Sequence, residues 1–453
     1  MERAPNTGVA IIVVGGGIAG LAFAIEGHRK GHNVQIFERR PRGDSDGEGI
    51  IILPHALITP KKWPGFLERA FSFCLCAKGT IKAHDGTVVT EFIAGTDTSP
   101  SLPIYRATLH KVLFEYAESL GIPIECDAKA KDFFETKEHG GIILTDGRRL
   151  TADVVVAADG VGTKSWETVI GTKDKPISSG FVLYRNSYPA TPALKNPIVA
   201  AEVGDAKEKS WLIHGPDAHI VIGLGQDKFF WVLTCREQTE ESTEDWSRYI
   251  SIDKAVAVVK DWYPFVPELI KQAPNGVMLD WKLMWRNPQP RWVAPRGRVV
   301  QIGDAAHPFL PTSANGANMA MEDGYTLAAC LQIGGKGNVP LATKVFNKLR
   351  FERVACAQKQ GFKNREHLHK ADLEFLKQHP EVLTSVYNNW MTTHNAEQYA
   401  YDNYVACASH IKNGTPFENS NGVPGYKYKP WTVEELMEAS DRGEPVHDEG
   451  LWN

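Results

Sequence analysis

The stretch VAIIVVGGGIAGLAFAIEGHRKGHNVQIFERR, residues 9–40, carries two strand patterns with a helical pattern between them. Residues 9–14 are all apolar, as expected for a strand that is buried on both faces of a parallel sheet. Residues 21–30 have helical character, and Gly31 stands where a helix would be capped at its C-terminal end. Residues 33–37 form a second apolar-rich strand. The stretch therefore predicts a complete βαβ unit.

Three glycines of this unit, Gly15, Gly17 and Gly20, form the pattern G-x-G-x-x-G. In such a pattern the first glycine permits a tight turn, the second lets a pyrophosphate approach the backbone, and the third allows close helix–strand packing. Glu38, at the tip of the second strand, can accept hydrogen bonds from a ribose diol. An ordinary glycine-rich turn would not account for Glu38. The unit predicts a dinucleotide site, and because no second fingerprint follows, the ligand could be NAD or FAD.

The composition of the 453-residue chain is that of an ordinary globular protein. A net charge of −4 and the lack of any basic run argue against nucleic acid as a partner. No stretch is long and apolar enough to span a bilayer, and no targeting signal is evident, so we expect a cytoplasmic protein without a membrane span. The seven cysteines include no CxxC pair, which predicts reduced thiols and no metal site.

Three separated segments together resemble the FAD-dependent aromatic hydroxylases, the single-component flavoprotein monooxygenases typified by para-hydroxybenzoate hydroxylase and salicylate hydroxylase. The first is GGGIAG, residues 15–20, with Glu38. The second, DVVVAADGVGTKS at residues 153–165, is similar to that family's Asp-Gly motif. The third, GDAAHPFLPTSANGANMAMED at residues 303–323, is similar to its Gly-Asp motif. The resemblance covers roughly residues 9–365, is closest to the salicylate hydroxylase-like branch, and favours FAD as the cofactor.

The resemblance implies a role for each motif in holding FAD. Asp304 would accept a hydrogen bond from the ribityl chain, and the helix that opens at Gly316 would direct N–H groups at the pyrimidine edge of the flavin. His307 would belong to the scaffold of the loop and take no part in catalysis. The residues that the resemblance implies as cofactor contacts are Gly15, Gly17, Ala19, Gly20, Glu38, Arg39, Ile51, Arg106, Asp159, Asp304, Gly316 and Ala317.

Arg185, in a Tyr-Arg pair that resembles the family's, is the predicted catalytic residue. An arginine there could hold a phenolate or carbonyl oxygen, and the alternative is an exposed strand residue. Where family members often carry Tyr-Pro on a later strand, this chain has Gly223–Leu224, and we infer space for a substrate bulkier than a simple benzoate. Thr163 and Trp166 stand where the Asp-Gly motif usually continues with Ser and Arg, which leaves NADH versus NADPH open.

The order of the motifs predicts an α/β fold with a discontinuous Rossmann-like FAD-binding domain, an inserted antiparallel β-sheet substrate domain and C-terminal helices. Five β-rich runs between residues 178 and 236, FVLYRNSY, NPIVAAEV, KSWLIHG, HIVIGLG and FFWVLTC, predict the inserted sheet. Helices are expected at residues 252–273 and 342–369. The predicted boundaries are residues 1–177 and 281–365 for the two parts of the FAD-binding domain, 178–280 for the substrate domain, and 366–453 for the C-terminal helical region and tail.

The resemblance implies a monooxygenase that uses FAD, NAD(P)H and O2 to hydroxylate or epoxidise an electron-rich aromatic compound. The expected substrate is a phenol or an indole of bulky, secondary-metabolite type, attacked through a flavin hydroperoxide. One alternative is an FAD-dependent dehydrogenase or oxidase that inserts no oxygen. A second is a flavin-binding protein without catalytic activity. The protein is expected to be a monomer or a homodimer.

Overall fold

The apolar run near the N-terminus forms the central strand of a parallel sheet. The computed structural model describes residues 1–44, 47–96, 98–172, 176–237, 248–370, 378–379, 389–444 and 448–452. Within these residues the sheet has five strands, all parallel, in the order β18-β11-β1-β2-β7. The strands are β1 (Ala10–Val14), β2 (Asn33–Phe37), β7 (Ile124–Glu125), β11 (Val154–Ala157) and β18 (Val299–Gln301).

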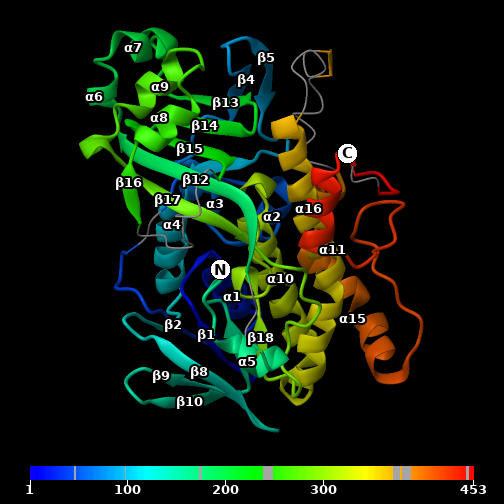
Figure 1. Cartoon of the computed structure of the whole chain (residues 1–453). Helices are drawn as coiled ribbons and strands as arrows, with labels where there is room; N and C mark the ends of the chain where they lie inside the picture. The colour runs from blue at the N-terminus through cyan, green and yellow to red at the C-terminus, as the bar shows by residue number, and fades with distance from the viewer. Residues whose placement is uncertain are drawn as a thin grey trace.

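Both faces of this sheet are buried, as the unbroken apolar pattern of β1 predicts. Ile11 and Val13 face a core shared with helices α1 (Ile18–Arg29) and α10 (Gly316–Gly334), whereas Ile12 and Val14 face a second core. The second core lies between the parallel sheet and a three-stranded antiparallel sheet, which is at the bottom of Figure 1. That sheet consists of β8 (Ala130–Glu135), β9 (Gly140–Leu144) and β10 (Arg149–Ala152).

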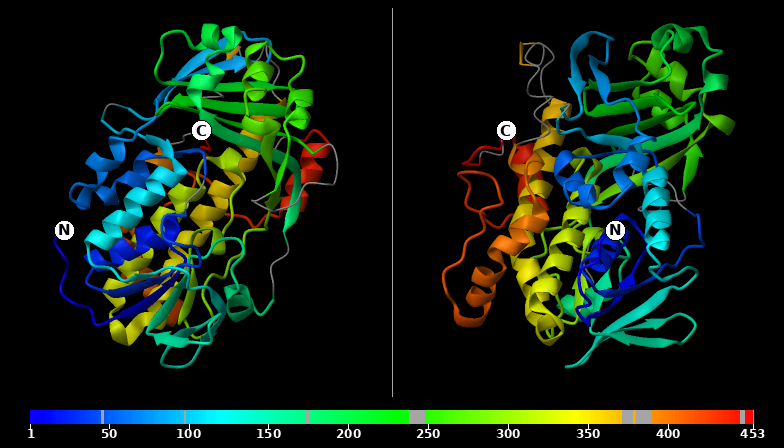
Figure 2. Two further views of the ribbon diagram at one scale, coloured as in Figure 1. Left: turned by 90° about the vertical axis from the view of Figure 1, so that its left-hand side faces the viewer. Right: turned by 180° about the vertical axis from the view of Figure 1, so that it is seen from behind.

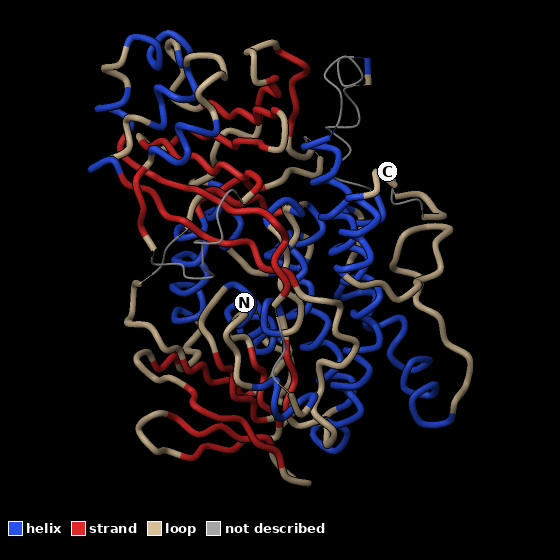
Figure 3. Tube along the Cα trace, viewed as in Figure 1, coloured by secondary structure: helices blue, strands red, loops and turns tan. Residues whose placement is uncertain are grey.

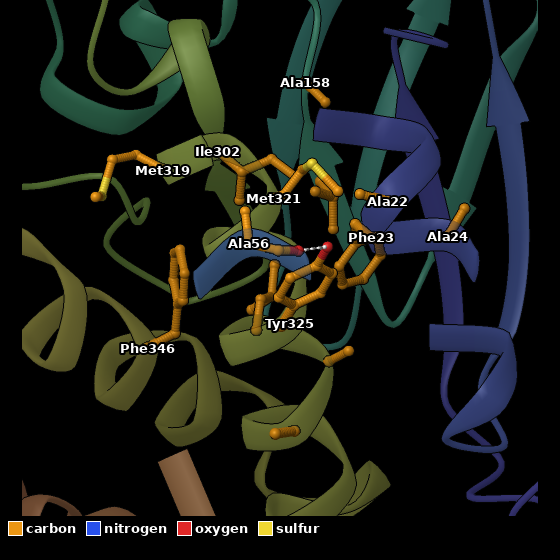
Figure 4. Close-up of a cluster of buried hydrophobic side chains, with 14 of the residues drawn as sticks. Ala22, Phe23, Ala24, Ala56, Ala158, Ile302, Met319, Met321, Tyr325 and Phe346 are labelled. Carbon is orange, nitrogen blue, oxygen red and sulfur yellow. Dashed lines mark hydrogen bonds between the residues drawn. The ribbon is translucent and has the colours of Figure 1, made fainter. Parts of the chain in front are cut away.

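Helices α1 and α10 pack closely because glycine lies at their contact. A Cβ atom on Gly324 would lie 2.8 Å from the backbone nitrogen of Phe23, so only glycine fits there. Figure 4 shows the surrounding cluster, in which Phe23, Met321 and Tyr325 meet between the two helices. The hydroxyl of Tyr325 donates to the carbonyl of Ala56 at 2.9 Å, which ties α10 to α2 (Pro54–Leu57).

A second sheet, of eight strands in the described chain, lies above the parallel sheet in Figures 1 and 3, and Figure 2 shows the same two parts from other sides. Its order is β16-β17-β12-β15-β14-β13-β4-β5, and every neighbouring pair is antiparallel except β13 and β4. The strands are β4 (Lys78–Ala83), β5 (Val88–Ile93), β12 (Ile177–Pro189), β13 (Lys209–Gly215), β14 (Ala218–Gly225), β15 (Lys228–Arg236), β16 (Tyr249–Ser251) and β17 (Val277–Trp285).

The predicted boundaries differ from this sheet in two places. Strands β4 and β5 lie within residues 1–177, which were predicted to belong to the FAD-binding domain, yet β4 forms a parallel ladder with β13. Strand β17 continues to Trp285, past the predicted boundary at residue 280. Both differences arise from pairing between distant segments, which leaves no local signal in the sequence.

The helices that cover one face of this sheet correct two further predictions. The run NPIVAAEV, read as a strand, forms helix α7 (Pro197–Val203), because the Asn196 side chain accepts from the backbone nitrogens of Ile198 and Val199 at the helix start. The helix expected at residues 252–273 is two short helices, with Pro264 at the start of the second. The two short helices are α8 (Asp253–Val258) and α9 (Phe265–Ile270), and α6 (Ala190–Ala193) also covers this face.

The C-terminal part of the chain is helical, as predicted, and packs along the molecule. Helix α11 (Val339–Lys370) runs beside both sheets and contacts α10, and α15 (Ala396–Asn413) contacts both of these helices (Figures 1 and 2). Helices α14 (Asn389–Thr392) and α16 (Val433–Asp441) complete this part. The predicted fold class is confirmed. In the described part of the chain we find no helix that could cross a membrane.

Candidate functional site

A cavity of about 690 Å³ lies where the glycine-rich turn, the Gly-Asp loop and the eight-stranded sheet meet. This volume falls within the range of small-molecule and cofactor pockets. Segments from all three parts line it, so motifs nearly three hundred residues apart face one space. The predicted cofactor residues in its lining are Gly17, Ala19, Ile51, Arg106, Asp304, Gly316 and Ala317.

The three glycines of the turn have different roles. Gly15 has φ +105°, and a Cβ atom there would lie 2.3 Å from the carbonyl oxygen of Ala158. A Cβ atom on Gly20 would lie 2.0 Å from the carbonyl oxygen of Gly15. At Gly17, by contrast, a Cβ atom would meet no described atom within 4 Å. Gly15 and Gly20 are therefore required by packing, whereas Gly17 leaves its backbone open toward the cavity.

Glu38 lies against this turn, where the sequence predicts it. Its carboxylate accepts from the backbone nitrogen of Gly16 at 2.5 Å and from that of Arg40 at 2.8 Å. Arg39, beside it, is exposed and does not line the cavity. The turn and the second strand thus present a fixed carboxylate beside the open backbone of Gly17.

Asp159, from the Asp-Gly motif, lies beside the cavity, which its neighbours Ala158 and Gly160 line. Burial raises the pKa of Asp159 to about 6, although Thr163 and Arg39 act in the opposite direction. Its Oδ1 atom finds no hydrogen-bond partner among the described residues. A buried acceptor without a partner fits a ligand hydroxyl or another donor from the cavity.

The Gly-Asp loop packs directly against the first helix of the βαβ unit. Gly303 has φ +57°, and a Cβ atom there would lie 2.9 Å from the Cβ of Ala19. The next residue, Asp304, lines the cavity, and burial raises its pKa while His307 and Arg106 act against this shift. Arg106 is the first residue of α4 (Arg106–Ser119). The two loops therefore converge, as the sequence predicts.

Helix α10 begins at Gly316 with no capping side chain from the described residues. Gly316 and Ala317 line the cavity, so the unpaired N–H groups of the first turn face it. The positive end of the helix dipole favours negative charge at this place. This start fits the electron-rich edge of a flavin ring, and together with the open backbone at Gly17 and the orphan oxygen of Asp159 it makes the cavity suitable for FAD.

A buried ionic network behind the loop was not predicted. Burial alone would raise the pKa of Glu322, but Arg353 and Arg350 hold it well below its usual value. Arg350 Nε donates to Asp323 at 2.8 Å, and His55 Nδ1 lies 2.7 Å from Glu322. The two arginines interrupt the apolar positions of the helix predicted at residues 342–369, and this interruption is the signal that could have revealed them.

His307 is joined to the same network. Its Nε2 lies 2.5 Å from Asp323 Oδ2, and the backbone nitrogen of Gly303 donates to that oxygen at 3.0 Å. Asp323 therefore fixes both ends of the turn that carries Asp304. The contacts agree with a scaffold role for His307.

Arg185 lies on β12 and is buried, so the alternative of an exposed strand residue is wrong. Its guanidinium pairs with the carboxylate of Glu48, which the sequence analysis did not single out. Arg185 stands directly opposite Val232 on β15, and Val232 lines the cavity. Because directly opposite residues project from the same face of a sheet, Arg185 lies on the cavity face, one strand away from the lining.

The space expected at Gly223 is filled by another side chain. A Cβ atom on Gly223 would lie 2.1 Å from the ring of Phe230, and one on Gly49 would lie 2.5 Å from the same ring. Phe230 also packs edge-on against Tyr105, with ring centroids 5.7 Å apart. The inference that the missing tyrosine enlarges the cavity is wrong at this position, because Phe230 occupies the vacated volume.

The chain is similar to known flavoproteins over its whole length. A family model described as FAD binding domain matches residues 8–340. FAD-dependent monooxygenase fsr3 of Gibberella fujikuroi is 35% identical over 477 residues, covering 100% of this chain and 91% of that protein. FAD-dependent monooxygenase dmxR9 of a Cryptosporiopsis species is also 35% identical, over 474 residues, with the same two coverages.

Solved structures of flavoproteins are also similar to this chain. The complex of CtdE with FAD and substrate 4 superposes with a TM-score of 0.83 at 30% identity, covering 89% of this chain and 100% of that one. A salicylate hydroxylase substrate complex superposes with a TM-score of 0.70 at 21% identity, covering 87% and 97%, and this likeness concerns the fold alone.

Proposed function

Because the chain belongs to the FAD-dependent monooxygenases, with an FAD binding domain over residues 8–340, we propose that it hydroxylates or epoxidises an uncharged, electron-rich aromatic compound. The reductant is NAD(P)H and the oxygen donor is O2. The observation that carries this proposal is that cofactor motifs and the apolar face of the second sheet line one cavity together. The fungal relatives fit a role in secondary metabolism.

Each cofactor motif binds a different part of FAD. The open backbone at Gly17 receives the diphosphate, and Glu38 accepts hydrogen bonds from the ribose. Asp304 accepts from the ribityl chain, and the first turn of α10 directs its N–H groups at the pyrimidine edge of the ring. When bound, FAD supplies the electron transfer and the activation of oxygen. The protein fixes the ring and excludes water from it.

The rest of the cavity favours an apolar, uncharged substrate. Its walls include Leu212, Val221 and Val232 from the sheet and Phe309 and Leu310 from the Gly-Asp loop. Among the described lining residues the charged side chains are two of each sign, Arg106, Lys209, Glu91 and Asp304. No cation is therefore in excess to bind a ring carboxylate, and a phenol or an indole fits better than a benzoate.

Arg185 remains the residue that we propose acts on the substrate. From the cavity face of β12 its guanidinium can stabilise oxygen-centred negative charge that develops on the ring. This role, the cytoplasmic location and the monomeric or homodimeric state stay predictions.

The test is a turnover experiment with the purified protein. Bound flavin is identified by its absorbance, and NADPH and NADH oxidation is measured with a panel of phenols and indoles. We expect one or more aromatics to accelerate flavin reduction and to gain one oxygen atom from isotopically labelled O2. If every aromatic gives only hydrogen peroxide and no oxygenated product, the proposal fails and the oxidase alternative is favoured.

A further inference from the structure

Strands β14 and β15 form a mostly apolar wall of the cavity. Of the residues that these two strands contribute to the described lining, only His219 and Thr234 have polar side chains. The two stand directly opposite each other in the ladder, so their side chains project from the same face of the sheet. Both residues are buried, and Thr234 is only 2% exposed. A buried polar position therefore interrupts an apolar wall.

The hydroxyl of Thr234 makes no hydrogen bond with any described residue, and neither does that of Ser210 on β13, which also lines the cavity. The other two hydroxyls of the lining are occupied. Thr312 donates to a backbone carbonyl of α11 at 3.3 Å, and Ser313 accepts from a backbone nitrogen of its own loop at 3.1 Å. Ser210 is half-buried, so bulk water can hydrate it, whereas burial at Thr234 leaves a hydroxyl that only a group in the cavity can satisfy.

Thr234 lies where the sheet meets the Gly-Asp loop. On the side away from β14 it stands directly opposite Leu183 of β12. Leu183 belongs to the same buried cluster as Leu310 of the Gly-Asp loop, and Leu310 also lines the cavity. An aromatic ring bound at Thr234 would therefore lie between the sheet and the loop that carries Asp304.

We propose that Thr234 binds a free hydroxyl group on the aromatic substrate. The inference rests on the proposed function, since it concerns the substrate of the same cavity. A threonine hydroxyl both donates and accepts, as a phenolic hydroxyl does, so either group can be the donor. Valine has nearly the same shape and would complete the apolar wall without a buried hydroxyl. The hydroxyl at this position therefore serves the ligand and not the fold.

The variant Thr234→Val tests this inference because it removes the hydroxyl and keeps the shape of the side chain. The full-length, FAD-loaded protein is titrated with 2-naphthol and naphthalene, and with 5-hydroxyindole and indole, two pairs that differ by one hydroxyl group. Binding is followed by the change in flavin absorbance. We expect the wild type to bind the hydroxylated member of at least one pair more tightly. Thr234→Val should reduce that preference roughly 3- to 10-fold, the effect of one hydrogen bond, and Thr234→Ser should retain it.

Two control variants make the result specific. Thr326→Val is the same substitution at a residue of α10 that is 1% exposed and lies outside the lining of the cavity. Ser210→Ala removes the other lining hydroxyl that no described residue binds. Neither control should change the preference. Urea unfolding of the FAD-free proteins gives a further readout, in which Thr234→Val should be at least as stable as the wild type.

Several outcomes would overturn the inference. They are an unchanged preference in Thr234→Val, an equal loss of preference in either control, or a wild type that prefers neither hydroxylated compound. Destabilisation of FAD-free Thr234→Val would also overturn it, because the hydroxyl would then stabilise the fold itself. If Thr234→Val does not load FAD, Thr234→Ala takes its place in the titration. The titration uses no reductant, so a protein that never inserts oxygen would refute the proposed function and leave this test standing.

Discussion

Replacement of Gly17 by alanine should weaken FAD binding while leaving the FAD-free protein as stable as the wild type. The backbone of Gly17 has φ −76° and ψ −176°, which alanine adopts freely, and the new methyl group would meet no described atom within 4 Å. The free energy of unfolding should therefore change by less than about 1 kcal/mol. The methyl group would, however, stand where the diphosphate approaches the helix.

The size of the binding defect follows from the hydrogen bonds at risk. A hydrogen bond from a backbone N–H to a charged group contributes about 1.5–3 kcal/mol. Loss of one such bond to the diphosphate would weaken FAD binding roughly 10- to 100-fold. Gly20→Ala is the matched control, since its methyl group would lie 2.0 Å from the carbonyl oxygen of Gly15. Overpacking of that kind destabilises the fold by about 1–3 kcal/mol even without FAD.

The assay compares the two variants in two measurements. Urea unfolding of the FAD-free proteins gives their stabilities, and quenching of flavin fluorescence gives the FAD dissociation constants. The expected pattern is a binding defect alone for Gly17→Ala and a stability defect for Gly20→Ala. Wild-type FAD affinity in Gly17→Ala would refute the assignment of the diphosphate to this turn, and equal destabilisation by both variants would refute the division between packing and binding glycines.

Three other substitutions probe the core, the pH response and the cavity wall. Glu322→Gln should lower the free energy of unfolding by about 3–5 kcal/mol in urea titrations, because Arg350 and Arg353 lose their shared buried counter-charge. Burial lowers the pKa of His214 from 6.5 to about 4 in the folded protein. As pH drops from 6.5 to 4, the unfolded chain is therefore protonated at His214 before the folded protein is, and the stability of the fold decreases. In His214→Asn the free energy of unfolding should depend less steeply on pH. The slope should be smaller by up to about 1.4 kcal/mol per pH unit, the value for one proton, when unfolding is measured across this range. Phe230→Ala should destabilise the protein by about 3–5 kcal/mol and admit bulkier aromatics over Gly223, which flavin absorbance titrations would detect, and an unchanged size preference would count against Phe230 as a wall.

Local sequence patterns predicted the elements that are stabilised by interactions within a few residues of one another. The βαβ unit at residues 9–40 was predicted closely, because its apolar strands and helix and its glycines act within a few residues of one another. The start of α10 at Gly316 was implied by the family resemblance, and the helix begins there. The prediction of a strand at NPIVAAEV was wrong, because the Asn196 side chain caps a helix that begins at Pro197.

Contacts between distant segments were beyond such patterns. Nothing near β4 indicates that it pairs with β13, and nothing near Glu48 indicates that its partner is Arg185, 137 residues later. The filling of the space at Gly223 by Phe230 is a contact within one hairpin, but it depends on the direction in which the Phe230 ring folds, and the strand pattern does not give that direction. A resemblance can indicate which residues surround a ligand, but only the packing shows which side chain occupies a vacated volume or balances a charge.

The first turn of α10 illustrates how such contacts prepare a binding site. Two asparagines lie at the start of this helix, and neither side chain caps it. Asn315 Nδ2 donates to the carbonyl of Ser313 at 2.6 Å and its Oδ1 accepts from no described residue, whereas Asn318 Oδ1 accepts from the backbone nitrogen of Leu53 at 2.8 Å. The nearest acidic side chain of the helix, Glu322, is neutralised by arginines of α11. The N–H groups of the turn therefore keep both their hydrogen-bonding capacity and their positive field for a ligand, and a side chain that capped them would compete directly with the flavin.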